Sequence, residues 1–189
     1  MGVLDEGERV RSADAATWRA WLEENHVRAA GVWLLSVRGN GPVGVGYEDA
    51  VRQALCFGWI DGPVRTFDDE TVGQWFSPRR ASSGWAATNK ARLAELEAAG
   101  ALAPAGIRAI EVAKANGSWE MLDGPEAGIE PAEFTAALDA VPAARAAWDA
   151  FPKSVKKLGL TLIATAKRPE TRSTRIAKIV ADAAEGKRP

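Results

Sequence analysis

Cysteine, histidine and tyrosine are almost absent from this sequence of 189 residues, which contains one of each. Cys56 has no partner for an internal disulfide, and Cys56 with His26 cannot complete the ligand set of a zinc site. Long apolar runs are also lacking, and the first eleven residues have no apolar stretch of the secretory kind. The sequence therefore predicts no disulfide, no metal, no membrane span and a cytoplasmic location.

Charge is nearly balanced over the whole chain, with a formal net charge of -1, but it is unevenly distributed. From Arg145 to the C-terminus there are 11 lysines and arginines against 4 acidic residues, so the first 144 residues carry an acidic excess. A near-neutral protein exerts little long-range attraction on nucleic acid, and the two parts can attract each other instead. The hydrophobic fraction of 47% is that of a globular protein and excludes disordered and collagen-like chains.

The apolar periodicity predicts an α+β fold. Helical spacing occurs at residues 13–24 and 47–58, and strand-like segments occur at 31–38, 59–67 and 72–77. We expect a small, mostly antiparallel three-stranded sheet covered by helices, with the last two strands forming a hairpin. Two helices should follow Pro78, at residues 82–100 (capped by Ser82 or Ser83) and 104–117. An all-helical C-terminal segment should come next, with helices at 131–138, 142–150, 152–166 and 169–184.

Residues 123–130 are the best candidate for a linker, because they are rich in glycine, proline and acidic side chains. This assignment divides the chain into an α+β domain at residues 1–122 and a helical segment at residues 131–189.

A glycine motif, GNGPVG at residues 39–44, has the spacing of a dinucleotide-binding loop and lies between a predicted strand and a predicted helix. A true fingerprint opens a repeating βαβ unit, whereas a hairpin follows here and helical residues begin only after Gly46. We interpret the motif as a loop and predict no cofactor.

Cys56 is the one candidate nucleophile that the residue types suggest. Its predicted place near the C-terminal end of a helix disfavours a thiolate, because that end carries the negative pole of the helix dipole. A buried, structural cysteine is the more frequent role for such a residue. We therefore predict no catalytic residue.

The strongest candidate site surrounds the predicted hairpin. Trp59 and Asp61 should point to one face of the sheet, and a pair of arginines follows the last strand. A polar amide on the apolar stripe of the next helix must find partners or cost about 1–3 kcal/mol. The candidate ligand-binding cleft consists of Trp59, Asp61, Arg79, Arg80, Trp85 and Asn89. A structural ion pair between Asp61 and one of the arginines is the competing interpretation.

A second candidate, for anions, lies at the start of the last predicted helix. Three arginines follow one another at helical spacing there, so they should share one face. The candidate anion-binding residues are Lys167, Arg168, Arg172 and Arg175. Such a pattern most often forms a solvated basic face. The more specific interpretation is a binding site for an anion or RNA.

Several motifs together resemble the YdeI/OmpD-associated, or bacteriocin-protection, family. They are YEDAV at 47–51, ALCFGWIDG at 54–62, FSPRR at 76–80 with Trp85 and Asn89, and AKRPETR at 166–172. The resemblance extends from about Trp18 to Gly186. Two positions depart from the family pattern: residues 36–38, where relatives are commonly more basic, and Ala86, where relatives commonly have serine.

The resemblance implies protection against bacteriocins or cationic antimicrobial peptides, sometimes in association with an outer-membrane porin, and it implies no catalytic residues. Our leading hypothesis is a non-enzymatic binding protein whose cleft takes a small anionic ligand or a peptide. One alternative is an enzyme on a small anionic metabolite, with Asp61 as acid or base and the arginines as a clamp. The other is nucleic-acid binding through the basic C-terminal helices.

Overall fold

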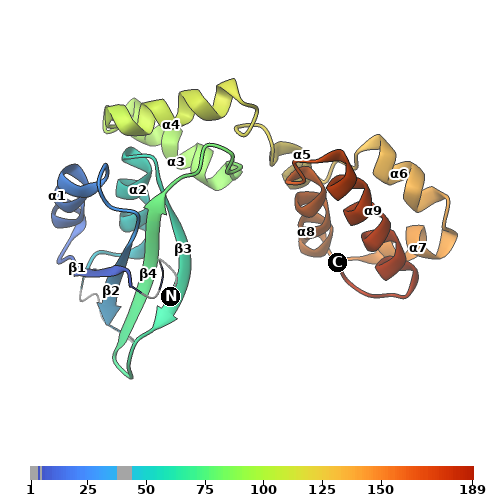
Figure 1. Ribbon diagram of the computed structural model, residues 1–189, viewed down its shortest axis with the longest axis horizontal. Coiled ribbons are helices and arrows are strands. Elements are labelled where there is room, and N and C mark those ends of the chain that lie inside the picture. The colour runs from blue at the N-terminus through green and yellow to red at the C-terminus, as the bar shows by residue number, and fades with distance from the viewer. Residues whose placement is uncertain (1–3, 5, 38–43) are drawn as a thin grey trace. The chain divides into compact units, whose positions relative to one another are not determined.

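The computed structural model describes residues 4, 6–37 and 44–189, and these form two units (Figure 1). The sheet unit comprises Met1–Ser83 and Thr88–Asn116, and the helical unit comprises Gly84–Ala87 and Gly117–Pro189. Apart from Gly44, the glycine motif at 39–44 lies outside the described residues.

A mixed four-stranded sheet is the centre of the sheet unit, in the order β1-β2-β4-β3. Both β2 and β3 pair with β4 in antiparallel fashion, as predicted, whereas β1 runs parallel to β2. The α+β class is confirmed, but the expected count of three strands was wrong. The strands are β1 Glu8–Arg11, β2 Val32–Val37, β3 Trp59–Thr66 and β4 Thr71–Pro78. The first strand escapes detection because it has four residues, mostly exposed, and so shows no apolar alternation.

Helices α1 and α2 pack against one face of this sheet (Figure 1). Asp14 caps the first of them, because its carboxylate accepts a hydrogen bond of 2.8 Å from the backbone N–H of Thr17. The chain leaves the second at Gly58, whose φ of +73° lies in the left-handed region that glycine adopts readily. The helices of the sheet unit are α1 Ala15–Asn25, α2 Tyr47–Cys56, α3 Ala87–Ala98 and α4 Pro104–Ala115.

The start of α3 differs from the prediction. The helix begins at Ala87, and neither Ser82 nor Ser83 caps it. Ala87 itself belongs to the helical unit, and its backbone N–H donates to the carboxylate of Glu126 of the same unit, at 2.8 Å and 39 residues further along the chain. A cap so distant in the sequence leaves no local signal.

Aromatic side chains fill both faces of the sheet. On the face toward α1, Phe76 lies 5.4 Å from Trp18 between ring centroids. On the other face, Trp33 and Trp75 lie 5.2 Å apart, and the indole N–H of Trp33 donates to the Leu4 carbonyl at 2.9 Å. Because both faces are covered, β2 is an almost continuous apolar run rather than an alternating one.

The helical unit has five helices, and the last four of them share one core. Phe134 and Trp148 are fully buried there and meet edge to face at 4.8 Å. The first helix occupies part of the predicted linker, and the other four follow the predicted ranges. Their bounds are α5 Asp123–Ala127, α6 Ala132–Asp139, α7 Pro142–Ala150, α8 Lys153–Ala164 and α9 Pro169–Ala184. Within residues 4, 6–37 and 44–189, no helix has both the length and the hydropathy that crossing a bilayer requires.

Candidate functional site

An open hollow of about 520 Å³ lies beside the edge strand β3, and we call it the edge hollow. It brings Asp61 and Arg80 of the predicted cleft together at a wall that includes Trp75 and two prolines. The lining residues are Leu4, Ala30, Ile60, Asp61, Gly62, Pro63, Trp75, Ser77, Pro78, Arg80 and Ser83. All of them belong to the sheet unit, so the hollow is complete within that unit.

Asp61 is half-buried and is held in place by a residue that the predicted cleft did not include. The hydroxyl of Tyr47, the first residue of α2, donates to Asp61 Oδ2 at 2.9 Å. Burial, followed by this bond to a carboxylate, raises the pKa of Tyr47, so the phenol remains protonated and remains a donor. Asp61 Oδ1 has no hydrogen-bond partner among the described residues, which leaves one oxygen available to a ligand.

The two arginines after β4 differ in their surroundings. Arg80 is exposed and lines the edge hollow. Arg79 is more enclosed, and burial lowers the pKa of its guanidinium to about 10, while the negative charge of Asp61 opposes that shift. Its backbone N–H donates to the Gly58 carbonyl at 3.0 Å, which fixes the start of this loop against the end of α2.

The other predicted cleft residues lie elsewhere. Trp59 is 1% exposed, packs edge-on against Trp21, and donates its indole N–H to the His26 carbonyl at 3.3 Å. Trp85 belongs to the helical unit, where its ring lies 5.3 Å from that of Trp119. Neither indole is among the residues that line the edge hollow.

Asn89 is 8% exposed and belongs to a polar network between α2 and α3. Its side-chain oxygen accepts a hydrogen bond from Arg92 at 2.8 Å, and Arg92 also binds the carboxylate of Glu48 at 2.5 and 2.9 Å. The hydrogen bond from Arg92 is the largest influence that lowers the pKa of Glu48. Asn89 thus orients an arginine that ties two helices together, which satisfies its buried amide oxygen.

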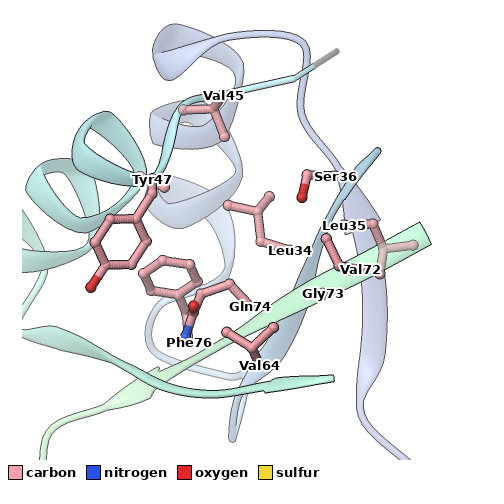
Figure 2. A pocket seen from close by; sticks show the side chains of 11 residues that line it. Leu34, Leu35, Ser36, Val45, Tyr47, Val64, Val72, Gly73, Gln74 and Phe76 are labelled. Carbon is pink, nitrogen blue, oxygen red and sulfur yellow. The ribbon is translucent and has the colours of Figure 1, made fainter. Parts of the chain in front are cut away.

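A second, more enclosed pocket of about 170 Å³ lies between α2 and the sheet, and we call it the apolar pocket (Figure 2). Most of its walls are aliphatic or aromatic, and none of its lining residues carries a formal charge at neutral pH. They are Leu34, Leu35, Ser36, Val45, Tyr47, Ala50, Val64, Val72, Gly73, Gln74 and Phe76. The sequence alone does not indicate this pocket, because it arises where α2 docks on the sheet.

Two family models match different parts of the chain. Residues 10–109 match a family described as a domain of unknown function (DUF8412), and residues 128–186 match the family described as "Bacteriocin-protection, YdeI or OmpD-Associated". The chain belongs to the DUF8412 family and carries a YdeI/OmpD-associated domain. The motifs at 47–51, 54–62 and 76–80 fall within the first match, and AKRPETR at 166–172 falls within the second. No curated protein and no solved structure matches the chain.

Two of the predicted anion-binding arginines in the YdeI/OmpD-associated domain donate hydrogen bonds to the C-terminal end of α8. Arg172 donates to the Ile163 carbonyl at 3.0 Å and pairs with Glu133 at 2.5 Å. Arg175 donates to the Leu162 carbonyl and to Thr165 Oγ1, the latter at 3.1 Å. These groups satisfy carbonyls that the last turn of a helix leaves unpaired. Lys167 and Arg168 are exposed just before α9.

Cys56, the last residue of α2, lies in the DUF8412 region and is fully buried. Burial is the largest influence on its thiol and raises the pKa, which favours the protonated, unreactive form at neutral pH.

Proposed function

We propose that this protein is a non-enzymatic binding protein of the bacteriocin-protection type, and that the edge hollow takes a short segment of a cationic peptide. The observation that carries the proposal is the meeting of Asp61 and Arg80 in one hollow of about 520 Å³ beside Trp75. Pockets of a few hundred Å³ with apolar walls and a few polar groups are typical of ligand sites.

The two opposite charges of the hollow would orient a bound peptide. Asp61 offers Oδ1 to a lysine or arginine side chain, while Tyr47 holds the other oxygen at 2.9 Å. Arg80 offers a planar guanidinium that suits a carboxylate, such as a peptide C-terminus. Ile60, Pro63 and the buried Trp75 supply apolar surface in the same hollow. A segment with a basic side chain and a free carboxylate therefore complements the hollow in charge and in polarity.

The family match supports a peptide as the ligand. Residues 128–186 match the bacteriocin-protection family, and bacteriocins and cationic antimicrobial peptides are the agents that this resemblance implies. The hollow lies outside that match, and all of its lining residues except Leu4 fall within residues 10–109. In this proposal the DUF8412 region holds the peptide.

Calorimetric titration with paired peptides tests the proposal. We use Gly-Trp-Arg-Gly with a free carboxylate, its C-terminal amide, and the analogue in which citrulline replaces arginine. Removing either charge from the peptide should weaken binding to the wild type about fivefold, as expected for partly exposed ion pairs. Asp61→Asn should lose the preference for arginine over citrulline, and Arg80→Gln should lose the preference for carboxylate over amide.

Two variants serve as controls. Asp69→Asn alters an exposed carboxylate in the turn between β3 and β4 and should bind like the wild type. Tyr47→Phe removes the hydrogen bond to Asp61 but keeps the carboxylate, so it should retain the arginine preference. A wild type that binds all three peptides equally would contradict the proposal. Bacterial survival under a cationic antimicrobial peptide should follow the same order of variants.

A further inference from the structure

The apolar pocket and the edge hollow lie against opposite faces of β4. Val72, Gln74 and Phe76 line the apolar pocket, whereas Trp75 and Ser77 line the edge hollow. This division follows from the alternation of side chains along a strand. The two sites share no lining residue, although Tyr47 of the apolar pocket donates to Asp61 of the edge hollow. Nothing below depends on peptide binding in the edge hollow.

The apolar pocket exists because α2 presents a small side chain to the sheet. Ala50 is 2% exposed and lines the pocket, and its carbonyl accepts a hydrogen bond of 3.1 Å from the Trp18 indole. That bond holds the helix backbone where it is, so the helix does not move in to fill the space. Leu34 and Phe76, both buried, form the opposite wall, and Figure 2 shows them between Tyr47 and the strand β4.

Two polar groups of the pocket have hydrogen-bonding capacity left. Gln74 donates its amide N–H to the Gly62 carbonyl at 2.6 Å, which fixes the orientation of the amide. Among the described residues, neither Gln74 Oε1 nor Ser36 Oγ has a hydrogen-bond partner. Both residues line the pocket, and the register pairs Leu34 with Gln74 and Ser36 with Val72, so they are near neighbours on this face. A ligand with one hydroxyl group can donate to an acceptor here.

The volume selects the size of the ligand. The pocket measures about 170 Å³, and an apolar protein cavity of about 150 Å³ is large enough for benzene. No lining residue carries a formal charge, so an ionised ligand would lose its hydration without gaining a partner. We infer that the apolar pocket binds a small, neutral ring compound with one hydroxyl group, of the phenol class. A ligand with so few atoms should bind with a dissociation constant on the order of 0.1–1 mM.

Titration of the ¹⁵N-labelled full chain with phenol, benzene and benzoate, followed by amide chemical shifts, tests this inference. Phenol should shift the amides of β2 and β4 around Leu34 and Gln74. Benzene, which lacks the hydroxyl, should bind about three- to tenfold more weakly, the value of one hydrogen bond. Benzoate at neutral pH should leave these amides unshifted. Absence of any phenol shift in β2 and β4, or equal binding of benzoate, would overturn the inference.

Space-filling variants locate the site. Ala50→Leu should fill the pocket and abolish phenol binding. Because a larger buried residue can perturb folding, Val64→Phe provides a second block from the β3 edge, where Val64 is 65% exposed. Val37→Phe is the matched control, since it places the same ring on β2 at a position that does not line the pocket. Unchanged phenol binding in a folded Val64→Phe protein, or equal loss in Val37→Phe, would place the ligand elsewhere.

One further variant separates this site from the edge hollow. Arg80→Gln alters a residue of the edge hollow that does not line the apolar pocket, so phenol binding should be unchanged. If phenol binding falls with peptide binding in that variant, the two sites are not distinct and the inference fails. If peptide binding is absent while the phenol shifts persist, the proposed function fails and the apolar pocket stands.

Discussion

Several charged side chains of the helical unit are bound to groups of that unit, whereas the sheet unit places two charged side chains at an open hollow. In the helical unit, Arg145 binds Glu130 at 2.7 Å, and Arg172 and Arg175 bind the last carbonyls of α8. In the sheet unit, Asp61 and Arg80 line a hollow of about 520 Å³. Some of the excess basic residues from Arg145 onward therefore form contacts within the unit. Their charge is partly neutralised there and is not fully available to a ligand.

Helix ends explain part of this difference. Five short helices expose many terminal carbonyls, and arginine side chains are well suited to satisfy them. A sheet satisfies its backbone through neighbouring strands, so side chains at its edge are available for other contacts. Three substitutions test whether the stability of each unit depends on its own contacts.

The largest effect is expected from Trp148→Ala in the helical unit. Trp148 is fully buried, meets Phe134 edge to face, and donates its indole N–H to Glu130 at 2.7 Å. Removal of a buried tryptophan should cost about 3–5 kcal/mol. Amide hydrogen exchange should rise sharply in α6–α9 and remain slow in β2 and β4. Comparable acceleration in the sheet would show that the two units do not unfold separately.

In the sheet unit, Gly106→Ala should destabilise the fold because α4 lies very close to α2. A Cβ at Gly106 would lie 2.3 Å from the Cys56 carbonyl oxygen, so α4 would have to move away from the end of α2. Overpacking of this kind should cost about 1–3 kcal/mol, measured by urea unfolding. Gly124→Ala in α5 is the control, because a Cβ there meets nothing within 4 Å. The control should be neutral or stabilising by up to about 1 kcal/mol, and equal destabilisation of both would contradict the packing argument.

The smallest effect concerns the pH dependence of the helical unit. Hydrogen bonds from Arg145 are the largest influence on Glu130 and lower the pKa of its carboxylate from the ordinary value of 4.5. The folded carboxylate has a lower pKa than the unfolded one, so its stabilisation is present above about pH 4.5 and is lost as the pH falls through the folded value.

Glu130→Gln should therefore lower the free energy of unfolding by about 1 kcal/mol at pH 7 and by less at pH 3. Urea unfolding of the helical unit at both pH values measures this. Glu120→Gln, at an exposed position of the same unit, should change neither value. A loss for Glu130→Gln that is the same at both pH values would rule out an ionised pair as the cause.

Most of the helices could be predicted because their signals are local. Pro169 begins the last helix and Gly58 follows α2, as the sequence indicated. The strand β1 could not be predicted, since a short exposed strand is identified by its partner rather than by its own residues. The cap of α3 by Glu126 depends in the same way on a distant contact.

The residues of the predicted cleft are brought together only in part, because two of the six, Asp61 and Arg80, line the edge hollow. Asp61 and Arg80 lie on neighbouring strands of a hairpin or just beyond it, and the structure places both in the edge hollow. Tyr47 and Ala50, which shape the site and the apolar pocket, come from α2. Their positions depend on how that helix docks on the sheet, and hydrophobic spacing gives the buried face of a helix but not its partners across the interface.

The parallel strand β1 also prevents β2 from pairing with a second copy of the protein. It occupies the free side of β2, whose residues from Val32 to Val37 read VWLLSV, an apolar sequence of high strand propensity. Glu8, Arg9 and Arg11 place charges along the outermost strand, which discourages another chain from adding to it. A shorter protein that begins after Arg11 would expose this apolar strand as an open border, a template for aggregation between copies.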